Sequence, residues 1–484
     1  MQLERIEQFQ DAAVTVMGLG KYKEGSGFVT VTWLIKHGAQ TVVTDLKTEA
    51  DLQSSLQLLM EWYREYRTAH PEANVYPPVF VLGEHRKEDF TDVDYVVQNP
   101  GVPSETAYMK AAEEAGVDIE SDTSIFLRFY PYKTIAVTGT KGKTTTTKLL
   151  GEMLNTLHPS AIVAGNVKAS PLQFLDGALE KKEEIPVVLE FSSWMLLSLP
   201  YALQDLGRGP DIAVLTNVYP DHMDRYPDYE AYKKSKEIIF AYQTPDQVAI
   251  LNKDHAEVRE MASRVPSRLL WFSTAPMEED GCFIENGIVK YRREGGIQDL
   301  LAVDDVALKG EHNLSNALAA ACAALVRGVP LAGVAEVLKR FSGIADRQEV
   351  VREVDEVTYV NDTASTAPEA LKVALETLGT EKRIVLLAGG DSRGVSFDAV
   401  APVIAHMCKQ VLLFPGTATE ALEKALLGRV MVDHVQTMEE AVKMARKFAA
   451  RGDVVLFSPG CPVGQPFANE FEAGEAFREE VRKI

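Results

Sequence analysis

The sequence predicts an α/β protein of three domains, built around a phosphate-binding loop near residue 140. Apolar runs of strand length alternate with helical patterns along the chain, and several of these runs end in turns that contain glycine. With 484 residues and 46% hydrophobic content, the chain is also longer than one hydrophobic core usually serves. We expect the domains to span residues 1–130, 131–341 and 342–484.

The phosphate loop lies in residues 133–150, KTIAVTGTKGKTTTTKLL. Glycines let backbone N–H groups approach phosphate oxygens at a helix N-terminus, Lys143 adds a positive charge, and the Thr144 hydroxyl can bind Mg²⁺. Val137 stands where the common G-x-x-x-x-G-K-[ST] motif has its first glycine, so the loop is unusually compact. The alternative is that this Gly-Lys-Thr turn arose by chance. Two glycines and four successive threonines after a strand make that interpretation the weaker one. The predicted nucleotide-binding residues are Gly139, Thr140, Lys141, Gly142, Lys143, Thr144 and Thr145.

Charge and cysteine usage exclude several classes of protein. A net charge of −20 and a pI near 5.0 argue against a general nucleic-acid or membrane-surface binder. The four cysteines are widely spaced without a C-x-x-C pair, so neither a disulfide framework nor a zinc site is indicated. The first ten residues carry charge where a signal peptide is apolar. We expect a cytoplasmic protein, a monomer with small-molecule partners and no nucleic-acid or membrane partner.

The N-terminal section opens like a nucleotide-binding βαβ unit. Residues 13–20 form an apolar strand that ends in a glycine turn, residues 28–37 favour a helix, and residues 41–45 form a second strand that ends in an acid. Glycines there admit a pyrophosphate, and the acid can meet a ribose or base. Lys21 to Lys23 interrupt the usual fingerprint, which makes a dinucleotide dehydrogenase the lesser possibility, and a plain turn between buried elements is another. Residues 95–98 predict a further strand with a turn at its end.

The central section places polar side chains after three apolar strands. Asn166, Glu190 and His222 each follow such a strand. Because parallel strands bring their carboxyl ends to one edge, Glu190 and His222 can hold a divalent ion beside Thr144. A single buried polar group of this kind is more often satisfied by a hydrogen bond in the core. Three such groups after parallel strands favour the metal site. The third section, from residue 342, again alternates strands with helical patterns and predicts another α/β domain.

Several motifs together resemble the Mur ligases, the ATP-dependent amide-forming enzymes of peptidoglycan precursor assembly. In order along the chain they are G-T-K-G-K-T-T (139–145), G-N (165–166), L-E-F-S-S (189–193), T-N-V-x-x-D-H-M-D-R-Y (216–226), H-N-x-x-N-A-x-A-A (312–320) and D-R-x-E (346–349). The D-H-M-D-R-Y run and the Rossmann-type N-terminal section are most similar to the members that add D-glutamate to UDP-N-acetylmuramoyl-L-alanine.

The resemblance implies a role for each matching residue. Lys143 and Thr144 would bind ATP phosphates and Mg²⁺, and Glu190 and His222 would position metals at two sites. Lys236 would be carbamylated and act as an anionic metal ligand, although one residue fewer than usual separates it from the histidine. The catalytic set would be Lys143, His222 and Lys236. Further ATP contacts would be Asn313 and Asn316 at the adenine, and Arg347 and Asp362 at the ribose and phosphates. Substrate contacts would be Gly18, Gly20, Lys21, Asp45, Asn99, Gly101, Asn166, Ser192, Arg393 and Phe471.

The C-terminal section departs from the family pattern where the incoming amino acid would bind. Residues 361–368 lack the family's lysine, Arg393 stands where lysine is usual, and residues 462–464 replace a stretch with a substrate-contacting serine. An arginine fork at position 393 can still clamp a carboxylate. Glutamate therefore remains the expected substrate, with its D or L configuration open.

Three functions stay open on the sequence. The first is ligation of glutamate, D-glutamate foremost, to UDP-N-acetylmuramoyl-L-alanine through an acyl phosphate. The second is another ligase of the superfamily, such as a Mur ligase that adds L-glutamate or a different amino acid, or a folylpolyglutamate synthetase, which the Rossmann-type region disfavours. The third is a phosphate-loop NTPase that regulates without ligation, which would have no need of Glu190, His222 and Lys236.

Overall fold

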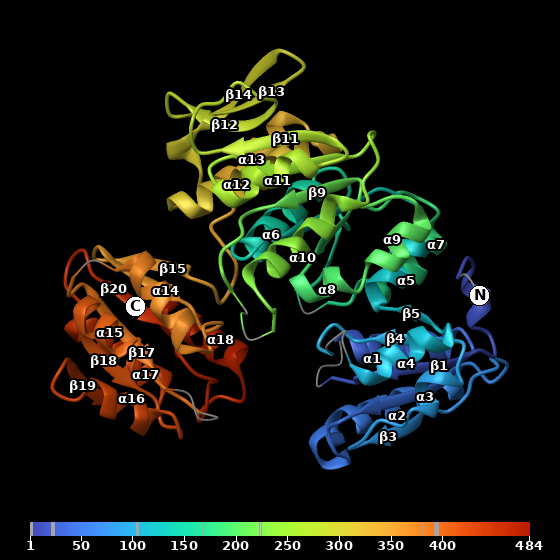
Figure 1. Cartoon of the computed structure of the whole chain (residues 1–484). Helices are drawn as coiled ribbons and strands as arrows, with labels where there is room; N and C mark the ends of the chain where they lie inside the picture. The colour runs from blue at the N-terminus through green and yellow to red at the C-terminus, as the bar shows by residue number, and fades with distance from the viewer. Residues whose placement is uncertain are drawn as a thin grey trace. The chain divides into compact units, whose positions relative to one another are not determined.

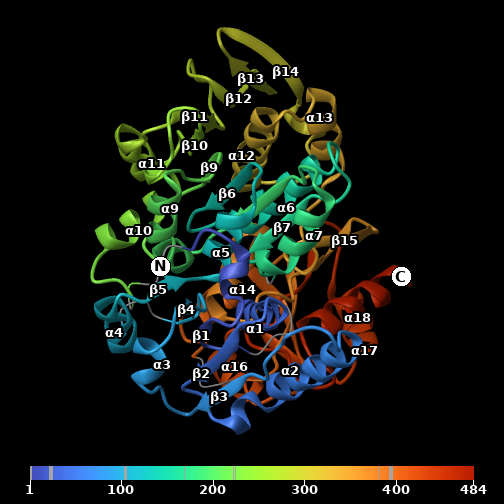
Figure 2. The ribbon, with the colours of Figure 1, turned by 90° about the vertical axis from the view of Figure 1, so that its right-hand side faces the viewer.

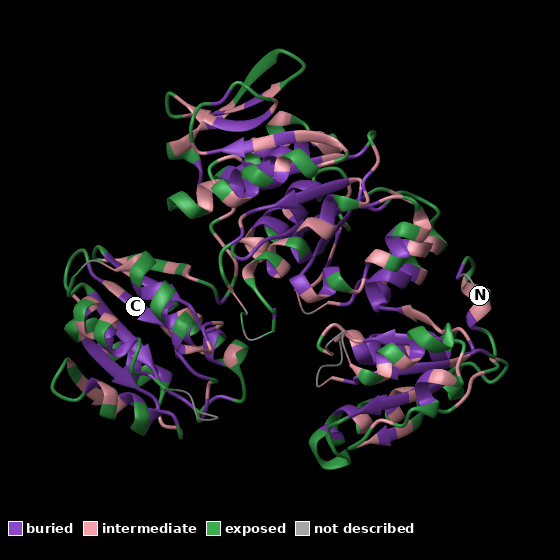
Figure 3. Cartoon of the chain, viewed as in Figure 1, coloured by how far each residue is buried: buried purple, intermediate pink, exposed green. Residues whose placement is uncertain are grey.

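The computed structural model describes residues 3–20, 25–102, 106–167, 169–221, 223, 225–379, 381–391 and 396–484 (Figure 1). The chain divides into two compact units, residues 1–341 and 342–484. The central strands of each sheet are buried, the edge strands β14, β15 and β19 are largely exposed, and the surrounding helices have exposed outer sides (Figure 3). Within the described ranges, every helix falls short of the length and apolar character that a membrane span requires.

The N-terminal sheet of the first unit has the strand order β3-β2-β1-β4-β5, with all pairs parallel. Its strands are β1 Ala13–Met17, β2 Gln40–Asp45, β3 Val79–Leu82, β4 Tyr95–Gln98 and β5 Asp118–Glu120. Its helical elements are η1 Ile6–Phe9, α1 Ser26–Lys36, α2 Glu49–Ala69, α3 Glu88–Thr91 and α4 Ala107–Ala115. The chain order reverses between β1 and β4, so the turns after these two strands border the crevice where open α/β sheets bind ligands.

The second sheet of this unit has the order β14-β13-β12-β11-β10-β9-β6-β8-β7 among the described residues. Its strands are β6 Thr134–Thr138, β7 Ile162–Gly165, β8 Val187–Glu190, β9 Ile212–Leu215, β10 Val248–Asn252, β11 Arg268–Ser273, β12 Gly281–Glu285, β13 Ile288–Arg293 and β14 Gly296–Ala302. The strands from β7 to β12 pair in parallel, and β12, β13 and β14 pair antiparallel.

Helices cover this sheet and connect it to the N-terminal one. They are α5 Asp122–Phe129, α6 Lys143–Leu154, η2 Pro171–Phe174, α7 Leu175–Lys181, α8 Ser193–Leu197, α9 Pro200–Leu206, α10 Tyr229–Ala241, α11 Ala256–Met261, η3 Ala262–Arg264, η4 Val303–Asp305, α12 Glu311–Arg327 and α13 Leu331–Arg340. Helix α6 packs against α12 and α13, as the view turned by 90° shows (Figure 2). The long alanine-rich α12 is buried along most of its length, because small side chains allow close packing.

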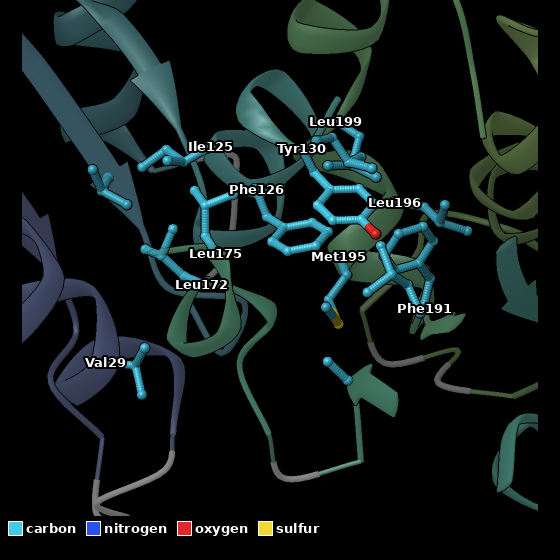
Figure 4. Packing of buried hydrophobic residues seen from close by; sticks show 14 of the residues in the cluster. Val29, Ile125, Phe126, Tyr130, Leu172, Leu175, Phe191, Met195, Leu196 and Leu199 are labelled. Atoms are coloured by element: carbon cyan, nitrogen blue, oxygen red, sulfur yellow. The ribbon is translucent and has the colours of Figure 1, made fainter. Parts of the chain in front are cut away.

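Helix α5 joins the two sheets of the first unit. Its apolar side chains pack toward residues of η2, α7 and α8, and Phe126 lies between Leu175 and Met195 (Figure 4). The buried guanidinium of Arg128 forms ion pairs with Glu120 at 2.8 Å and with Asp205 of α9. One continuous core therefore runs through this part of the unit.

The second unit holds a sheet of order β15-β16-β20-β17-β18-β19, in which only the β15–β16 pair is antiparallel among the described strands. Its strands are β15 Glu349–Val354, β16 Val357–Asn361, β17 Ile384–Ala388, β18 Cys408–Leu413, β19 Met431–His434 and β20 Val454–Phe457. Its helices are α14 Pro368–Leu378, α15 Ala401–Met407, α16 Thr419–Leu426, α17 Met438–Phe448 and α18 Glu470–Arg482.

The predicted fold class, α/β with Rossmann-like sheets and a central phosphate-loop domain, is confirmed. The strands expected before the ligand turns are present, β1, β2, β4, β6, β8 and β9 among them. The antiparallel extension β12 to β14 was not anticipated, because its strands mix polar and apolar residues without strict alternation.

Candidate active site

The phosphate loop connects β6 to α6, and two of its glycines stand where a side chain would be strained. Gly139 has φ +152° and Gly142 has φ +80°, both in the region that disfavours other residues. A Cβ at Gly139 would collide with Thr216 Oγ1, and one at Gly142 would collide with Asn316 Oδ1. Side chains that follow β9 and that come from α12 therefore press directly on the loop. This close approach explains the compact glycine spacing.

The segment after β9 holds the loop by hydrogen bonds. The Lys141 amide donates to Asn217 Oδ1 at 2.8 Å, and the Asn217 Nδ2 donates back to Lys141 O at 3.1 Å. Thr216 Oγ1 also donates to Lys141 O at 2.7 Å. The Lys143 ammonium, at the first position of α6, donates to Thr140 O at 3.0 Å. The first turn of α6 also carries Thr144 and Thr145, so a helix N-terminus with backbone amides and hydroxyls follows the loop, an arrangement that suits phosphate oxygens.

Glu190 ends β8, beside the loop strand β6 in the sheet. The side chain is fully buried, and its Oε1 accepts a hydrogen bond from Asn166 Nδ2 at 2.8 Å. Its Oε2 has no hydrogen-bond partner among the described residues. Burying a carboxylate oxygen without a hydrogen-bond donor costs free energy, and a bound divalent cation would offset that cost. The predicted placement of Asn166 and Glu190 at one sheet edge is thus observed.

Lys236 lies on α10 with 1% of its surface exposed. Its Nζ is 3.5 Å from Thr138 Oγ1 and 5.0 Å from the centre of the Tyr232 ring. Burial and, after it, the charge of Lys143 lower the pKa of Lys236 to about 7, against the opposing effect of Asp221 and Glu190. A large fraction of this amine is therefore neutral near pH 7, in contrast to an exposed lysine.

Metal ligation is supported here by chemistry rather than by a preformed cluster. Within the described residues, no three His, Cys, Asp or Glu side chains gather closely enough to hold an ion. His222, predicted as a metal ligand, lies outside the described residues, as do Lys21 and Arg393. The buried Glu190 Oε2 and the hydroxyl of Thr144 are the described groups that fit a divalent cation.

A second set of predicted residues lies at the carboxyl edge of the N-terminal sheet. Gly18 and Gly20 follow β1 with φ +93° and +78°, and Asp45 ends β2. The Asp45 carboxylate accepts the Leu19 amide at 3.1 Å. Asn99, after β4, donates from Nδ2 to Gly18 O at 3.2 Å, and its Oδ1 accepts the Gly101 amide at 3.1 Å. Five predicted residues, Gly18, Gly20, Asp45, Asn99 and Gly101, thus surround one sheet edge.

Other predicted residues have local structural roles as well. Ser192 is the N-cap of α8 and accepts the Met195 amide at 3.3 Å. Asn313, one turn before Asn316 on α12, donates to Lys309 O at 2.8 Å. In the second unit, Arg347 is exposed, Asp362 is buried at the end of β16, and Phe471 is half exposed on α18. Desolvation raises the pKa of Asp362 to about 6.

Three residues near these sites were missed in the sequence. Tyr232 shares a 3.0 Å hydrogen bond with the loop hydroxyl of Thr140. Asn217 holds Lys141, and His85 Nδ1 lies 2.6 Å from the Oγ1 of Thr44, the neighbour of Asp45. Tyr232 stands four residues before Lys236, so helical spacing was a usable signal. Nothing in the sequence pattern alone brings His85 to the end of β2.

Comparison with known proteins identifies the family. Residues 137–324 match the Mur ligase middle domain, and residues 346–461 match the Mur ligase glutamate ligase domain. A protein of Roseiflexus sp. (strain RS-1) named UDP-N-acetylmuramoylalanine--D-glutamate ligase is 41% identical over 481 residues, covering 97% of this chain and 98% of that protein. One of the same name from Koribacter versatilis is 33% identical and covers 97% of both chains.

Solved structures share the fold. The UDP-N-acetylmuramate-alanine ligase MurC of Thermotoga maritima matches with a TM-score of 0.53 and 19% identity, over 98% of this chain and 99% of that one. MurF of Acinetobacter baumannii matches with a TM-score of 0.56 and 18% identity, over 97% and 93%. Together with the full-length relatives, these matches show that the chain belongs to the Mur ligase family.

Proposed function

We propose that this protein joins D-glutamate to UDP-N-acetylmuramoyl-L-alanine in peptidoglycan precursor synthesis, with ATP converted to ADP and phosphate. Membership of the family makes it an ATP-dependent ligase, and its full-length relatives carry the name of this reaction. The observation that carries the proposal is the meeting of three features around the neighbouring strands β6 and β8. They are the phosphate loop, the Glu190 oxygen that has no partner among the described residues, and the buried amine of Lys236. A nucleotide switch would not need the Glu190 oxygen or the Lys236 amine.

The first step activates the substrate carboxylate. A carboxylate oxygen of the alanyl group attacks the γ-phosphorus of ATP, the bond from that phosphorus to the β–γ bridging oxygen breaks, and ADP leaves. Catalysis of this step depends on alignment and charge neutralisation. Lys143, held by Thr140 O, and the amides that open α6 would bind the phosphates. Lys141 and Thr145 belong to the same cradle, and Asn313 and Asn316 are proposed adenine contacts.

The second step forms the amide. The amine of glutamate attacks the carbonyl carbon of the acyl phosphate, a tetrahedral intermediate forms, and the bond from that carbon to the phosphate oxygen breaks. The amine loses a proton, and phosphate leaves. Arg393 and Phe471 are proposed contacts of the glutamate, since an arginine fork suits a carboxylate. Both lie in the unit of residues 342–484, which we propose as the amino-acid-binding domain.

Magnesium at two sites would be held by Thr144, Glu190, His222 and the modified Lys236. When bound, Mg²⁺ neutralises charge on the transferred phosphoryl group and orients it. The fit rests on Glu190, whose buried Oε2 is unpartnered among the described residues while its other oxygen is fixed by Asn166. Asn166 therefore turns the carboxylate so that one oxygen remains for a cation.

Carbamylation of Lys236 is proposed because the amine is buried and readily neutral. The Nζ lone pair attacks the carbon of CO₂, the nitrogen loses a proton, and an anionic carbamate results. Burial and, after it, the charge of Lys143 lower the pKa of Lys236 and so disfavour its ammonium form, whereas the carbamate would place an anion near Lys143. The carbamate would then serve as a metal ligand.

The crevice of the N-terminal sheet is the proposed site of the UDP moiety. Backbone amides at Gly18 and Gly20 would meet the diphosphate, with Lys21 beside them, and Asp45 would meet the uridine. Asn99 and Gly101 border the same edge, and Asn166 and Ser192 would contact the sugar-peptide portion. Residues 1–130 would thus form the UDP-binding domain and residues 131–341 the ATP-binding domain.

A phosphate-release assay tests the function. The purified protein is given ATP and UDP-N-acetylmuramoyl-L-alanine with D-glutamate, L-glutamate, or a panel of other D- and L-amino acids. We expect phosphate release that requires both co-substrates and prefers D-glutamate. A preference for L-glutamate would overturn the stereochemical part alone, and release indifferent to both co-substrates would overturn the ligase proposal.

A further inference from the structure

The segment that carries Arg347 in the second unit has an unusual backbone. Asp346 and Gln348, on either side of Arg347, have φ values of 64° and 44°. Residues other than glycine adopt this conformation at a cost in free energy, and they keep it where the surroundings fix it, often at functional sites. The Arg347 side chain itself is exposed. Some other group must therefore hold the backbone that presents it.

Backbone hydrogen bonds fasten the segment to the residues after β16. The Gln348 amide donates to Asp362 Oδ1 at 3.1 Å, and the Ala364 amide donates to Asp346 O at 2.9 Å. Within the segment, the Asp346 amide donates to Glu349 Oε2 at 3.0 Å. The backbone on either side of Arg347 is thus held by the carboxylates of Asp362 and Glu349 and by the Asp346 carbonyl. The carboxylates of Asp346 and Glu349 lie close enough to share donors.

These two like charges share their donors. Arg478 Nη1 donates to Asp346 Oδ1 and to Glu349 Oε2, both at 2.9 Å. Asn361 Nδ2 donates to the same two oxygens at 2.9 and 3.1 Å, and Thr363 Oγ1 donates to Asp346 Oδ1 at 3.2 Å. Among the described residues, Arg478 is the cation that forms ion pairs with both acids. Its side chain is 13% exposed, so solvent screens these pairs only weakly.

Helix α18 packs close enough to β15 and β16 for Arg478 to contact Asp346 and Glu349. Gly474, one turn before Arg478, faces the cluster, and a Cβ there would collide with Asp346 Oδ1 and lie 2.8 Å from Thr363 Oγ1. A second ion pair, between Arg478 Nη2 and Glu475 Oε2 at 2.9 Å, orients the guanidinium from its own helix. The contact requires two residues four positions apart on α18: Gly474, which leaves room for the Asp346 carboxylate, and Arg478, which pairs with it.

We propose that Arg478 is a positioning residue for ATP, acting through Arg347. It holds Asp346 and Glu349 together and so fixes the left-handed turns that aim the Arg347 side chain. Without the guanidinium, the two neighbouring carboxylates keep only neutral donors among the described residues, namely Asn361, Thr363 and the Asp346 amide, and their repulsion shifts the segment. The inference rests on the ATP-binding role proposed for Arg347, and it adds a residue far along the sequence that controls that role.

A double-mutant cycle on the full-length protein tests the proposal. KM for ATP and kcat are measured for Arg347→Ala, Arg478→Gln and the double variant, with saturating co-substrates. We expect each single change to raise KM for ATP about tenfold with a smaller effect on kcat, since charged hydrogen bonds are involved. The double variant should match Arg347→Ala, because Arg478 acts through that residue. Arg478→Lys, which keeps the charge, should lie between wild type and Arg478→Gln.

The matched control is Arg482→Gln on the same helix. Arg482 also pairs with Glu475, at 3.7 Å, but is 64% exposed and makes no ion pair with the segment among the described residues, so its loss should leave KM for ATP unchanged. If Arg347→Ala leaves KM unchanged, the role of Arg347 is wrong and the inference is overturned with it. If Arg347→Ala raises KM but Arg478→Gln does not, or the effects multiply in the double variant, only the inference is overturned. Should Arg478→Gln fail to fold, the cycle with Arg478→Lys decides by the same criteria.

Discussion

Lys236 is the residue at which burial and chemistry are most closely linked. An ammonium in this position is desolvated and lies near the charge of Lys143, and both effects favour the neutral amine. Its Nζ lies 5.0 Å from the centre of the Tyr232 ring and 3.5 Å from Thr138 Oγ1. The ring face and the charges of Asp221 and Glu190 favour a cation, but burial and the charge of Lys143 outweigh them. This environment supports the proposed reaction of the amine with CO₂.

Removal of the Lys236 amine should nearly abolish turnover. In Lys236→Ala, no carbamate can form, and we expect a loss of at least about a hundredfold in kcat, as for other metal-orienting and charge-stabilising groups. Formate or acetate at high concentration should restore part of the activity by replacing the missing anion. Lys234→Ala is the control, because Lys234 is exposed on the same helix and should tolerate the change. Undiminished turnover of Lys236→Ala would contradict the assignment.

The pH dependence of carbamylation follows from the lowered pKa of Lys236. At a pKa of about 7, the neutral fraction of the amine rises from about one tenth at pH 6 to about nine tenths at pH 8. At fixed dissolved CO₂, the carbamate signal in a ¹³C NMR spectrum should therefore grow across this interval. For a lysine of ordinary pKa, the growth would come only above about pH 9. A signal that first appears there would show that burial does not activate this amine.

Tyr232 should matter for nucleotide binding through the loop that it supports. Tyr232→Phe removes the hydrogen bond to Thr140, and we expect KM for ATP to rise about threefold to tenfold, corresponding to about 0.5–1.5 kcal/mol. Tyr226→Phe is a matched control, because the Tyr226 hydroxyl is buried without a hydrogen-bond partner among the described residues. Its loss should leave KM unchanged. Equal effects of the two changes would argue against a specific role for the Tyr232 hydroxyl.

At the scale of elements, the phosphate loop depends on the segments packed over it. Gly142 is the N-cap of α6 with φ +80°, and its missing Cβ leaves room for Asn316 of α12. Gly142→Ala should weaken ATP binding by more than tenfold in equilibrium titration, since both the backbone and the contact are disturbed. Gly177→Ala on α7 has no atom within 4 Å of the new Cβ. It should leave ATP binding intact and leave stability unchanged or raise it by up to about 1 kcal/mol.

The same loop shows what the sequence can predict about an element and what it cannot. The loop is marked by local features: a strand, two glycines, and a lysine and a threonine at the start of a helix. The sequence alone therefore predicts a phosphate loop at residues 139–145. The partners of the loop come from residues that lie far along the chain, Thr216, Asn217, Tyr232 and Asn316. Of these, only Asn316 has a site role that the family resemblance implies. Long-range contacts of this kind leave no periodic signal in the sequence.

The turn around Arg347 gives a second example at this scale. The D-R-x-E motif marks Arg347 by resemblance alone, because nothing in the motif shows that Asp346 and Gln348 have positive φ. Arg478 and Gly474 stand more than 100 residues later in an ordinary amphipathic helix. Their contact with Asp346 arises from the packing of α18 on β15 and β16.

Across the whole molecule, we propose that three sheets divide the binding of three ligands. The crevice between β1 and β4 would take the UDP end, the β6 loop would take ATP, and the unit of residues 342–484 would take the amino acid. The fold class was predictable from the alternation of strands and helices, and the proposed ligand sites lie at turns that follow parallel strands. The D or L configuration of the amino acid could not be predicted, because the departures at Arg393 and Val463 alter the family pattern that would have indicated it.

An isotope-transfer experiment tests the central claim most directly. UDP-N-acetylmuramoyl-L-alanine labelled with ¹⁸O in its alanyl carboxylate is incubated with ATP and D-glutamate, and the phosphate and the UDP-linked product are analysed by mass spectrometry. Attack of the carboxylate on the γ-phosphorus predicts one ¹⁸O in each phosphate released and a product heavier by one glutamyl residue. Phosphate without the label, or release without that product, would contradict ligation through an acyl phosphate.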